Sequence, residues 1–352
     1  MKREIELWRQ LTGRRPGPPT LTPEERSVVV RGIKKLSVGF GGGRNIAGQR
    51  YLDDPALLGA YLLFFGPISE RQAASALRRS GIAALEGRAL DVGAGAGSVA
   101  RALVSFGVGE VVALDHSDAA VRLAKQWVGA ALTPRTWTPE MPLPEGPFRI
   151  VSFGHVLNEL WKREPDRIAR RVAMIQQAAA QLSADGQIFV LEPATHAINR
   201  EMLELRDALA ATGWRIDAPC IRQAFCPALA AGVACHADVP GAVDREHEAL
   251  ARLARLPKDT VAYGWLLVRP PGPLALDARD VRVVSERLRN KAGRERFVVC
   301  GVDGRFSLSA APSHPDRTWR ALARGDAVRV TDPEIRENGW GVDPGTRLER
   351  PK

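Results

Sequence analysis

Short apolar segments alternate with amphipathic ones from residue 88 onward, and this alternation limits the possible fold more than any other feature of the sequence. Four strand-like runs cover residues 89–92, 110–115, 148–153 and 187–192. Apolar residues at helical spacing mark the segments between and after them, at 98–106, 118–129, 164–182 and 198–212. Strands that alternate with helices require a parallel sheet covered on both faces. We therefore predict an α/β fold with a Rossmann-like core.

Other patterns lie on either side of this alternation. A Pro-rich opening precedes expected helices at 23–36 and 53–80, and a glycine-rich basic loop at 38–50 lies between them. Strand-like runs at 214–218 and 261–269 close the core, with a cysteine-rich segment, 218–240, inserted between them. We expect an N-terminal helical basic extension (1–85), a core (86–270) in which this cysteine-rich segment is a metal-binding loop, and a small C-terminal β-rich module (271–352) that contributes Cys300. Strand-like runs in this module lie at 281–284, 296–300, 306–309 and 327–331.

The positive charge of the chain is concentrated in its flanks. Residues 1–85 hold 14 Lys/Arg against 7 Asp/Glu, residues 86–270 hold 20 against 21, and residues 271–352 hold 16 against 12. A near-neutral centre with basic flanks favours a ligand-binding core that its extensions attach to a polyanion, of which nucleic acid is the usual example. The alternative is an ordinary solvated surface rich in arginine.

A glycine-rich loop follows the first strand of the core and opens a helix. It reads Asp91-Val-Gly93-Ala-Gly95-Ala-Gly97, and the next strand ends in Asp115, 18 residues after Gly97. Backbone N–H groups at such a turn can approach a ligand closely, and a carboxylate at the end of the next strand can accept both hydroxyls of a ribose. An acid at the start of the loop resembles the class I S-adenosylmethionine-dependent methyltransferases. That resemblance implies a cofactor site formed by these five residues.

The fourth strand-like element ends in Phe-Gly-His155-Val-Leu-Asn158-Glu159, which in the class I fold faces the methyl donor and the acceptor. His155, Asn158 and Glu159 are therefore the candidate catalytic residues. Their alternative role is helix capping within a satisfied hydrogen-bond network. The chain has no Asn/Asp-Pro-Pro-Tyr/Phe motif of amino-group methylases, so the catalytic residue stays unassigned.

Three of the four cysteines fall in one short segment, at Cys220, Cys226 and Cys235, and the fourth is Cys300. Thiolates at short spacings on a segment rich in Pro and Gly are suitable ligands for zinc or for an iron–sulfur cluster. The alternatives are small buried hydrophobic residues or two disulfides. His236 could replace one cysteine in a zinc site, although four cysteines already suffice.

The sequence has no apolar run of about 18 residues that could span a bilayer, and its first residues lack the apolar stretch of a secretory signal. We expect a protein of the cytoplasm, where thiols stay reduced, and we expect no membrane partner. We also expect a monomer.

Four segments together resemble the methyltransferase-like 17 family of small-ribosomal-subunit factors. They are 90–97, 155–160, the Glu192-Pro pair, and 218–236 with its three cysteines. The resemblance implies S-adenosylmethionine binding, engagement of small-subunit rRNA in ribosome assembly or translation, and a [4Fe–4S] cluster on Cys220, Cys226, Cys235 and Cys300. Two alternatives stay open. One is an assembly factor that keeps the cofactor pocket without transferring methyl groups, and the other is a small-molecule methyltransferase with a structural zinc.

Overall fold

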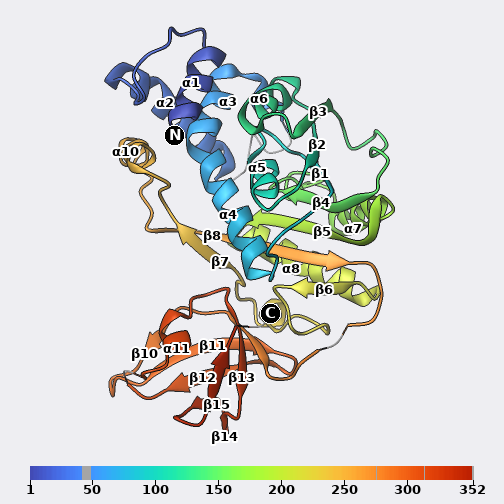
Figure 1. Ribbon diagram of the computed structural model, residues 1–352, viewed down its shortest axis with the longest axis vertical. Helices are drawn as coiled ribbons and strands as arrows, with labels where there is room; N and C mark the ends of the chain where they lie inside the picture. The colour runs from blue at the N-terminus through green and yellow to red at the C-terminus, as the bar shows by residue number, and fades with distance from the viewer. Residues whose placement is uncertain (42–48, 275, 313, 351–352) are drawn as a thin grey trace.

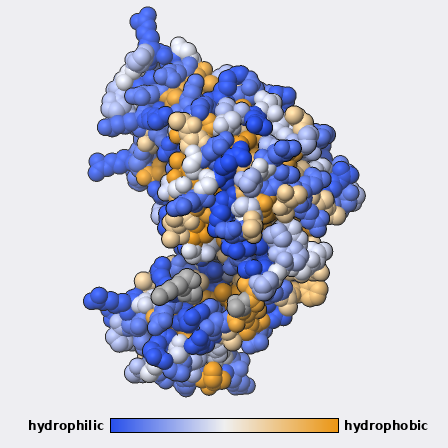
Figure 2. Space-filling model, turned by 45° about the vertical axis from the view of Figure 1, so that its right-hand side comes forward, coloured by the Kyte–Doolittle hydropathy of each residue, from blue (hydrophilic) through white to orange (hydrophobic). Residues whose placement is uncertain are grey.

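The computed structural model of the protein describes residues 1–41, 49–274, 276–312 and 314–350. A helical N-terminal region lies above a central sheet, and a second sheet forms the opposite end of the molecule (Figure 1). The outline of the surface is hollowed where the second sheet meets the main body (Figure 2). No helix in the described ranges combines the length and apolar character of a membrane span.

The central sheet has the order β3-β2-β1-β4-β5-β8-β6, with β7 paired to β8. Its strands are β1 (Arg88–Val92), β2 (Glu110–Asp115), β3 (Leu132–Thr136), β4 (Phe148–Gly154), β5 (Leu182–Pro193), β6 (Arg215–Ala218), β7 (Ala237–Pro240) and β8 (Thr260–Arg269). The first five strands of the order are parallel, and β8 runs antiparallel to β5, β6 and β7. The order reverses between β1 and β4, and in open α/β sheets ligands bind at the carboxyl ends of the strands flanking such a reversal.

Helices cover both faces of this sheet, as the alternation of apolar runs requires. One face buries α4 (Gly66–Arg79) and α5 (Ser98–Ser105), and the other buries α7 (Arg167–Ala179) and α8 (His196–Ala211). The predicted segments at 98–106, 118–129, 164–182 and 198–212 correspond to α5, α6 (Asp118–Val128), α7 and α8. The fold is therefore the predicted α/β class with a Rossmann-like sheet.

The N-terminal residues form α1 (Lys2–Leu11), α2 (Pro23–Phe40), the short turn η1 (Tyr51–Asp53), α3 (Pro55–Ala60) and the π-helical turn η2 (Tyr61–Phe65). The helix predicted at 53–80 is thus divided into α3, η2 and α4. The glycine-rich loop predicted at 38–50 begins inside α2, and its residues 42–48 lie outside the described residues. These helices share a hydrophobic core with α6 and with α10 (Arg245–Ala254).

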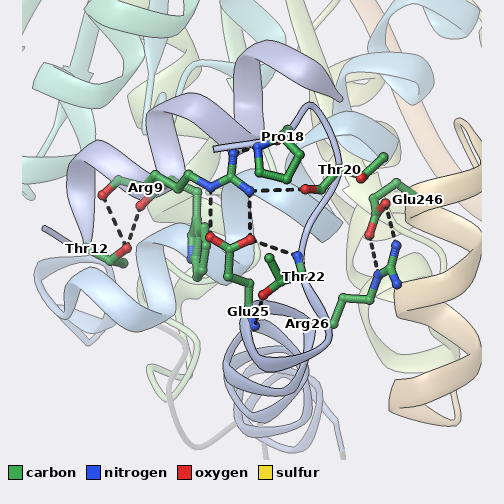
Figure 3. A network of polar contacts seen from close by, with 9 residues as sticks. Arg9, Thr12, Pro18, Thr20, Thr22, Glu25, Arg26 and Glu246 are labelled. Carbon is green, nitrogen blue, oxygen red and sulfur yellow. Dashed lines mark hydrogen bonds and ion pairs between the residues drawn. The ribbon is translucent and has the colours of Figure 1, made fainter. Parts of the chain in front are cut away.

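Two ion pairs fix this helical region (Figure 3). Arg9 donates from Nε and Nη2 to the two carboxylate oxygens of Glu25 at 2.8 and 2.7 Å, and both side chains are buried. The same carboxylate accepts the backbone N–H of Thr22, which caps α2. Arg26 pairs with Glu246 at 2.7 Å and joins α2 to α10. The N-terminal region is therefore fastened to an element that follows the cysteine segment in sequence.

The second sheet has the order β14-β15-β12-β11-β9-β13-β16, with β10 paired to β11. Its elements are β9 (Asp280–Val283), β10 (Leu288–Arg289), β11 (Glu295–Gly301), β12 (Gly304–Ala310), α11 (Arg317–Ala321), β13 (Ala327–Thr331), β14 (Glu334–Arg336), β15 (Gly339–Val342) and β16 (Arg347–Glu349). It encloses a core of its own around Phe297 and Trp319. The four strands predicted in the tail correspond to β9, β11, β12 and β13.

Candidate functional site

The glycine-rich loop connects β1 to α5, and all three of its glycines have positive φ. A Cβ at Gly93 would lie 2.4 Å from Val156, and one at Gly97 would lie 2.9 Å from Ala124, so neither position admits a side chain. A Cβ at Gly95 would make only an ordinary 3.5 Å contact with Leu52. Gly93 and Gly97 therefore serve close packing, and Gly95 is the glycine of the loop at which a Cβ has room.

Asp91 lies beneath this loop and supports it from inside. The side chain is fully buried, and its carboxylate accepts hydrogen bonds from the Ser152 hydroxyl at 2.7 Å and from the Ala100 backbone N–H at 3.2 Å. Burial raises the pKa of Asp91 to about 7. Both carboxylate oxygens bond within the protein, so Asp91 orients the loop and the start of α5 in this structure.

Asp115 ends β2 and joins the loop to the next helix. One carboxylate oxygen accepts the Gly95 N–H at 2.9 Å, and the other accepts the Ser117 N–H at the same distance. Burial raises the pKa of this carboxyl group. The arrangement brings together the predicted cofactor-binding residues Gly95 and Asp115 at the carboxyl ends of β1 and β2.

The turn η1 crosses the loop, which the sequence did not indicate. Leu52 lies over Gly95, and the Tyr51 hydroxyl is 3.5 Å from the Glu159 carboxylate. Arg50 donates to the His116 carbonyl at 3.1 Å and pairs with Asp53. The segment 50–53 thus contacts the loops that follow β1, β2 and β4. The segment Arg-Tyr-Leu-Asp at 50–53 carries no local signal for such a role, because the contacts depend on the tertiary fold.

His155 begins the loop after β4 in the left-handed region, with φ of 60°. Both of its ring nitrogens are buried, and neither has a hydrogen-bond partner within the described residues. Burial lowers the pKa of His155 to about 4, so the ring is neutral near pH 7. Buried imidazole nitrogens normally have partners, so this ring is a candidate for contact with a bound ligand.

Glu192, at the end of β5, holds the His155 loop in place. Its carboxylate accepts the Asn158 backbone N–H at 3.0 Å and the Asn158 side-chain amide, which also donates to the His155 carbonyl at 2.8 Å. Burial raises the pKa of Glu192 to about 8. Asn158 is therefore part of a satisfied network, as one of the sequence interpretations had it. Glu192 was not among the predicted site residues, although the Glu-Pro pair that ends the strand marked its position.

The four cysteines form a second site, at the junction of the two sheets. Cys220, Cys226, Cys235 and Cys300 all line one cavity of about 40 Å³, which is room for a few water molecules. The segment predicted as a loop contains α9 (Pro227–Ala230) and β7, and Cys300 lies in β11 of the other sheet. All four are free thiols.

Side chains of helix α8 hold the backbone at two of the cysteines. The Asp207 carboxylate accepts the Cys226 N–H at 3.0 Å. The Asn199 side chain accepts the Cys235 N–H at 2.9 Å and donates to the Cys235 carbonyl at 2.8 Å. These bonds fix the chain on either side of the cavity independently of the sulfur atoms.

A single zinc ion needs sulfurs about 2.3 Å from the metal and therefore about 3.8 Å from each other. Over the described ranges, no three His, Cys, Asp or Glu side chains are grouped closely enough to hold one ion. Burial raises the pKa of the Cys235 thiol and brings that of Cys300 to about 12. The four sulfurs surround a space, and the expected iron–sulfur cluster stays a prediction.

Arginines form much of the remaining wall of the cavity, together with His236. The wall includes Arg206 from α8 and Arg282 from β9, both buried, as well as Arg222 and Arg305. His236 forms a side-chain contact with Arg324, so it has a partner other than a metal. The residues that line this cavity include none of the glycine-loop residues and neither Asp115 nor His155.

The strand order, with one antiparallel strand inserted before the last, and the glycine loop at the reversal between β1 and β4 define an α/β protein of the class I methyltransferase architecture. A model of the family described as mitochondrial small ribosomal subunit Rsm22 matches residues 87–309, more than half of the chain. The chain therefore belongs to the Rsm22 family. The match spans the donor-site residues from Asp91 to Glu192 and all four cysteines. The narrower methyltransferase-like 17 assignment stays a prediction.

Solved structures with similar folds are methyltransferases of low sequence identity. DhpI in complex with SAH is 18% identical, with 70% of this chain and 99% of that chain covered and a TM-score of 0.36. A SAM-dependent methyltransferase from Leishmania major is 13% identical, with coverages of 76% and 91% and a TM-score of 0.39. A ribosomal protein L11 methylase from Lactobacillus delbrueckii subsp. bulgaricus is 16% identical, with coverages of 58% and 80% and a TM-score of 0.35. A search of curated proteins gave no match.

Proposed function

We propose that this chain is an S-adenosylmethionine-binding, iron–sulfur-containing methyltransferase-like protein that binds or acts on small-subunit rRNA during ribosome assembly or translation. One observation carries most of the proposal: cysteines from the core and from the C-terminal module line one cavity in a chain of the Rsm22 family. The family description names the small ribosomal subunit, and the basic flanks suit a polyanion.

S-adenosylmethionine, when bound, supplies an activated methyl group. The Gly95 turn and the N-terminus of α5 offer a close approach to the backbone, and the Asp115 carboxylate is placed to accept ribose hydroxyls. The unpartnered ring nitrogens of His155 offer a donor and an acceptor to a ligand. Asn158, itself held by Glu192, bonds to the backbone carbonyl of His155 and fixes the start of this loop.

The residues of the cavity also fit an iron–sulfur cluster. Four cysteines are the usual ligand set of a [4Fe–4S] centre, and all four line this cavity. A bound cluster would link the core to the C-terminal module through Cys300. Because none of the donor-site residues line this cavity, we assign the cluster a structural role.

A second candidate function is an assembly factor that binds rRNA without transferring methyl groups. The observation that favours it is the cover that η1 places over the donor loop, through Leu52 on Gly95 and Tyr51 beside Glu159. Transfer of a labelled methyl group to isolated small ribosomal subunits distinguishes the two functions. Crosslinking to rRNA distinguishes both from a small-molecule methyltransferase.

The direct test of the metal assignment is preparation of the protein without oxygen. The proposal expects broad absorption near ~400 nm together with iron and sulfide in the protein. Stoichiometric zinc without sulfide would favour a structural zinc site, and a metal-free protein with four open thiols would refute a metal centre altogether.

A further inference from the structure

Two buried arginines face the four-cysteine cavity from opposite modules. Arg206, on α8, is 1% exposed, and Arg282, on β9, is 5% exposed. Both side chains line the same cavity as the cysteines. A buried guanidinium is normally matched by a carboxylate, because an isolated charge loses its hydration.

Arg282 has no such match. Its guanidinium donates to three backbone carbonyls, those of Pro219, Arg79 and Gly325, at 2.8 to 2.9 Å. No ion pair joins it to a carboxylate within the described residues. The nearby carboxylate of Asp326 is already paired with Arg79 at 2.5 Å. Burial lowers the pKa of Arg282 to about 10, so the group is still charged at neutral pH.

Arg206 is only partly matched. Its Nη1 pairs with Asp207 at 2.6 Å and donates to the Ala224 carbonyl at the same distance. The Asp207 carboxylate also accepts the Cys226 N–H. The Nε of Arg206 is buried and has no hydrogen-bond partner in the described part of the chain. Of the two buried cations beside the four cysteines, only Arg206 has a carboxylate partner within the described residues.

We infer that Arg206 and Arg282 are the counter-charges of an anionic metal–thiolate centre in this cavity and that they raise its reduction potential. The inference rests on the iron–sulfur cluster of the proposed function. Four thiolates and a [4Fe–4S]²⁺ core carry a net charge of about −2, which becomes about −3 when the core takes one electron from an external reductant. The gain of negative charge is favoured next to fixed cations. No proton or group is transferred in this step.

The two arginines differ in the size of the expected effect. Arg282 has no directly paired carboxylate among the described residues, so its charge is less neutralised than that of Arg206. Arg206 is partly neutralised by Asp207, so its removal should shift the potential less. Arg222 is a matched control, because it lines the same cavity but is only half-buried and donates to the carbonyls of Val302 and Phe225.

The test is a redox titration of the anaerobically purified full chain with dithionite, followed by absorbance and electron paramagnetic resonance. Arg282→Gln should lower the potential enough to change the ratio of reduced to oxidised cluster at least tenfold at a fixed potential, equivalent to 59 mV for one electron. Arg282→Lys, which keeps the charge, should stay close to the wild type, and Arg222→Gln should change little. Arg206→Gln should give a smaller shift in the same direction.

The outcomes separate this inference from the function on which it rests. A wild-type protein without iron and sulfide would overturn both. A wild-type cluster whose potential is unchanged in Arg282→Gln and Arg206→Gln would overturn the inference alone. If Arg282→Gln fails to fold because three carbonyls lose their donor, the result with Arg206→Gln decides: a lowered potential supports the inference, and an unchanged one refutes it.

Discussion

Gly95→Asp should remove donor binding while the protein stays folded. Gly95 has φ of +51°, a region that Asp and Asn enter more readily than other side chains, at a cost of about 1 kcal/mol. The new Cβ meets only Leu52, at an ordinary 3.5 Å. Against a typical stability of about 5–15 kcal/mol, such a loss leaves the fold intact.

The effect on binding should be much larger than the effect on stability. The added carboxylate extends from the one glycine of the loop where a Cβ has room, and it lies close to Asp115, whose own carboxylate accepts the Gly95 N–H. The donor then loses both its space and its approach to the backbone. We expect an affinity for S-adenosylmethionine at least about 100-fold weaker, equivalent to about 2.8 kcal/mol.

Calorimetric titration with S-adenosylmethionine measures this loss, and thermal unfolding checks the fold. Gly95→Asn is the neutral control of nearly the same shape, and it should bind more tightly than Gly95→Asp. Gly93→Asp gives the opposite pattern, because its Cβ would lie 2.4 Å from Val156 and the fold itself should fail. Undiminished affinity in a folded Gly95→Asp protein would refute the assignment of the loop.

Three further results are expected. The pKa of Glu192 in the folded protein, about 8, is above its ordinary value of 4.5. The stabilising contribution of this carboxyl group is therefore complete below pH 4.5 and is lost as the pH rises through about 8. Glu192→Gln should flatten that decline in the free energy of unfolding, measured with urea between about pH 5.5 and 8.5. Arg9→Met leaves Glu25 buried without its partner and should cost about 3–5 kcal/mol of unfolding free energy, whereas a cost below about 1 kcal/mol would contradict a desolvated pair. Cys300→Ser should abolish absorption near ~400 nm and increase proteolysis of residues 271–352, and a variant that keeps full iron and sulfide would exclude Cys300 as a ligand.

The order of elements could be predicted because the hydrophobic period is local. The runs ending at Val92, Asp115, Phe153 and Glu192 all lie in strands of the central sheet, and the tail strands were located in the same way. The short strands β3 and β7 and the helix α10 were missed. They are brief or polar, so their stability comes from neighbours that are distant in sequence. The division of the helix at 53–80 was missed because a π-helical turn leaves no gap in an apolar pattern.

The site was predictable as residue types but not as roles. The loop from Asp91 to Gly97 predicts a cofactor site, and only the structure separates Gly95, where a Cβ has room, from the two glycines that fill packing gaps. Asp91 stays a predicted cofactor residue, and the structure adds that its oxygens accept hydrogen bonds from Ser152 and Ala100. The cover of Leu52 over the loop had no local signal at all.

The sequence by itself determined the alternation of strands and helices, the glycine turn and the supply of four thiols, because backbone conformation and ligand chemistry are properties of short segments. Only the tertiary structure decided that Cys300 meets the other three cysteines, and that Arg206 and Arg282 face them without enough carboxylates. Contacts between residues so distant in sequence depend on how the two sheets pack. The free energy of a buried charge depends on the polar and charged groups that surround it in the folded protein.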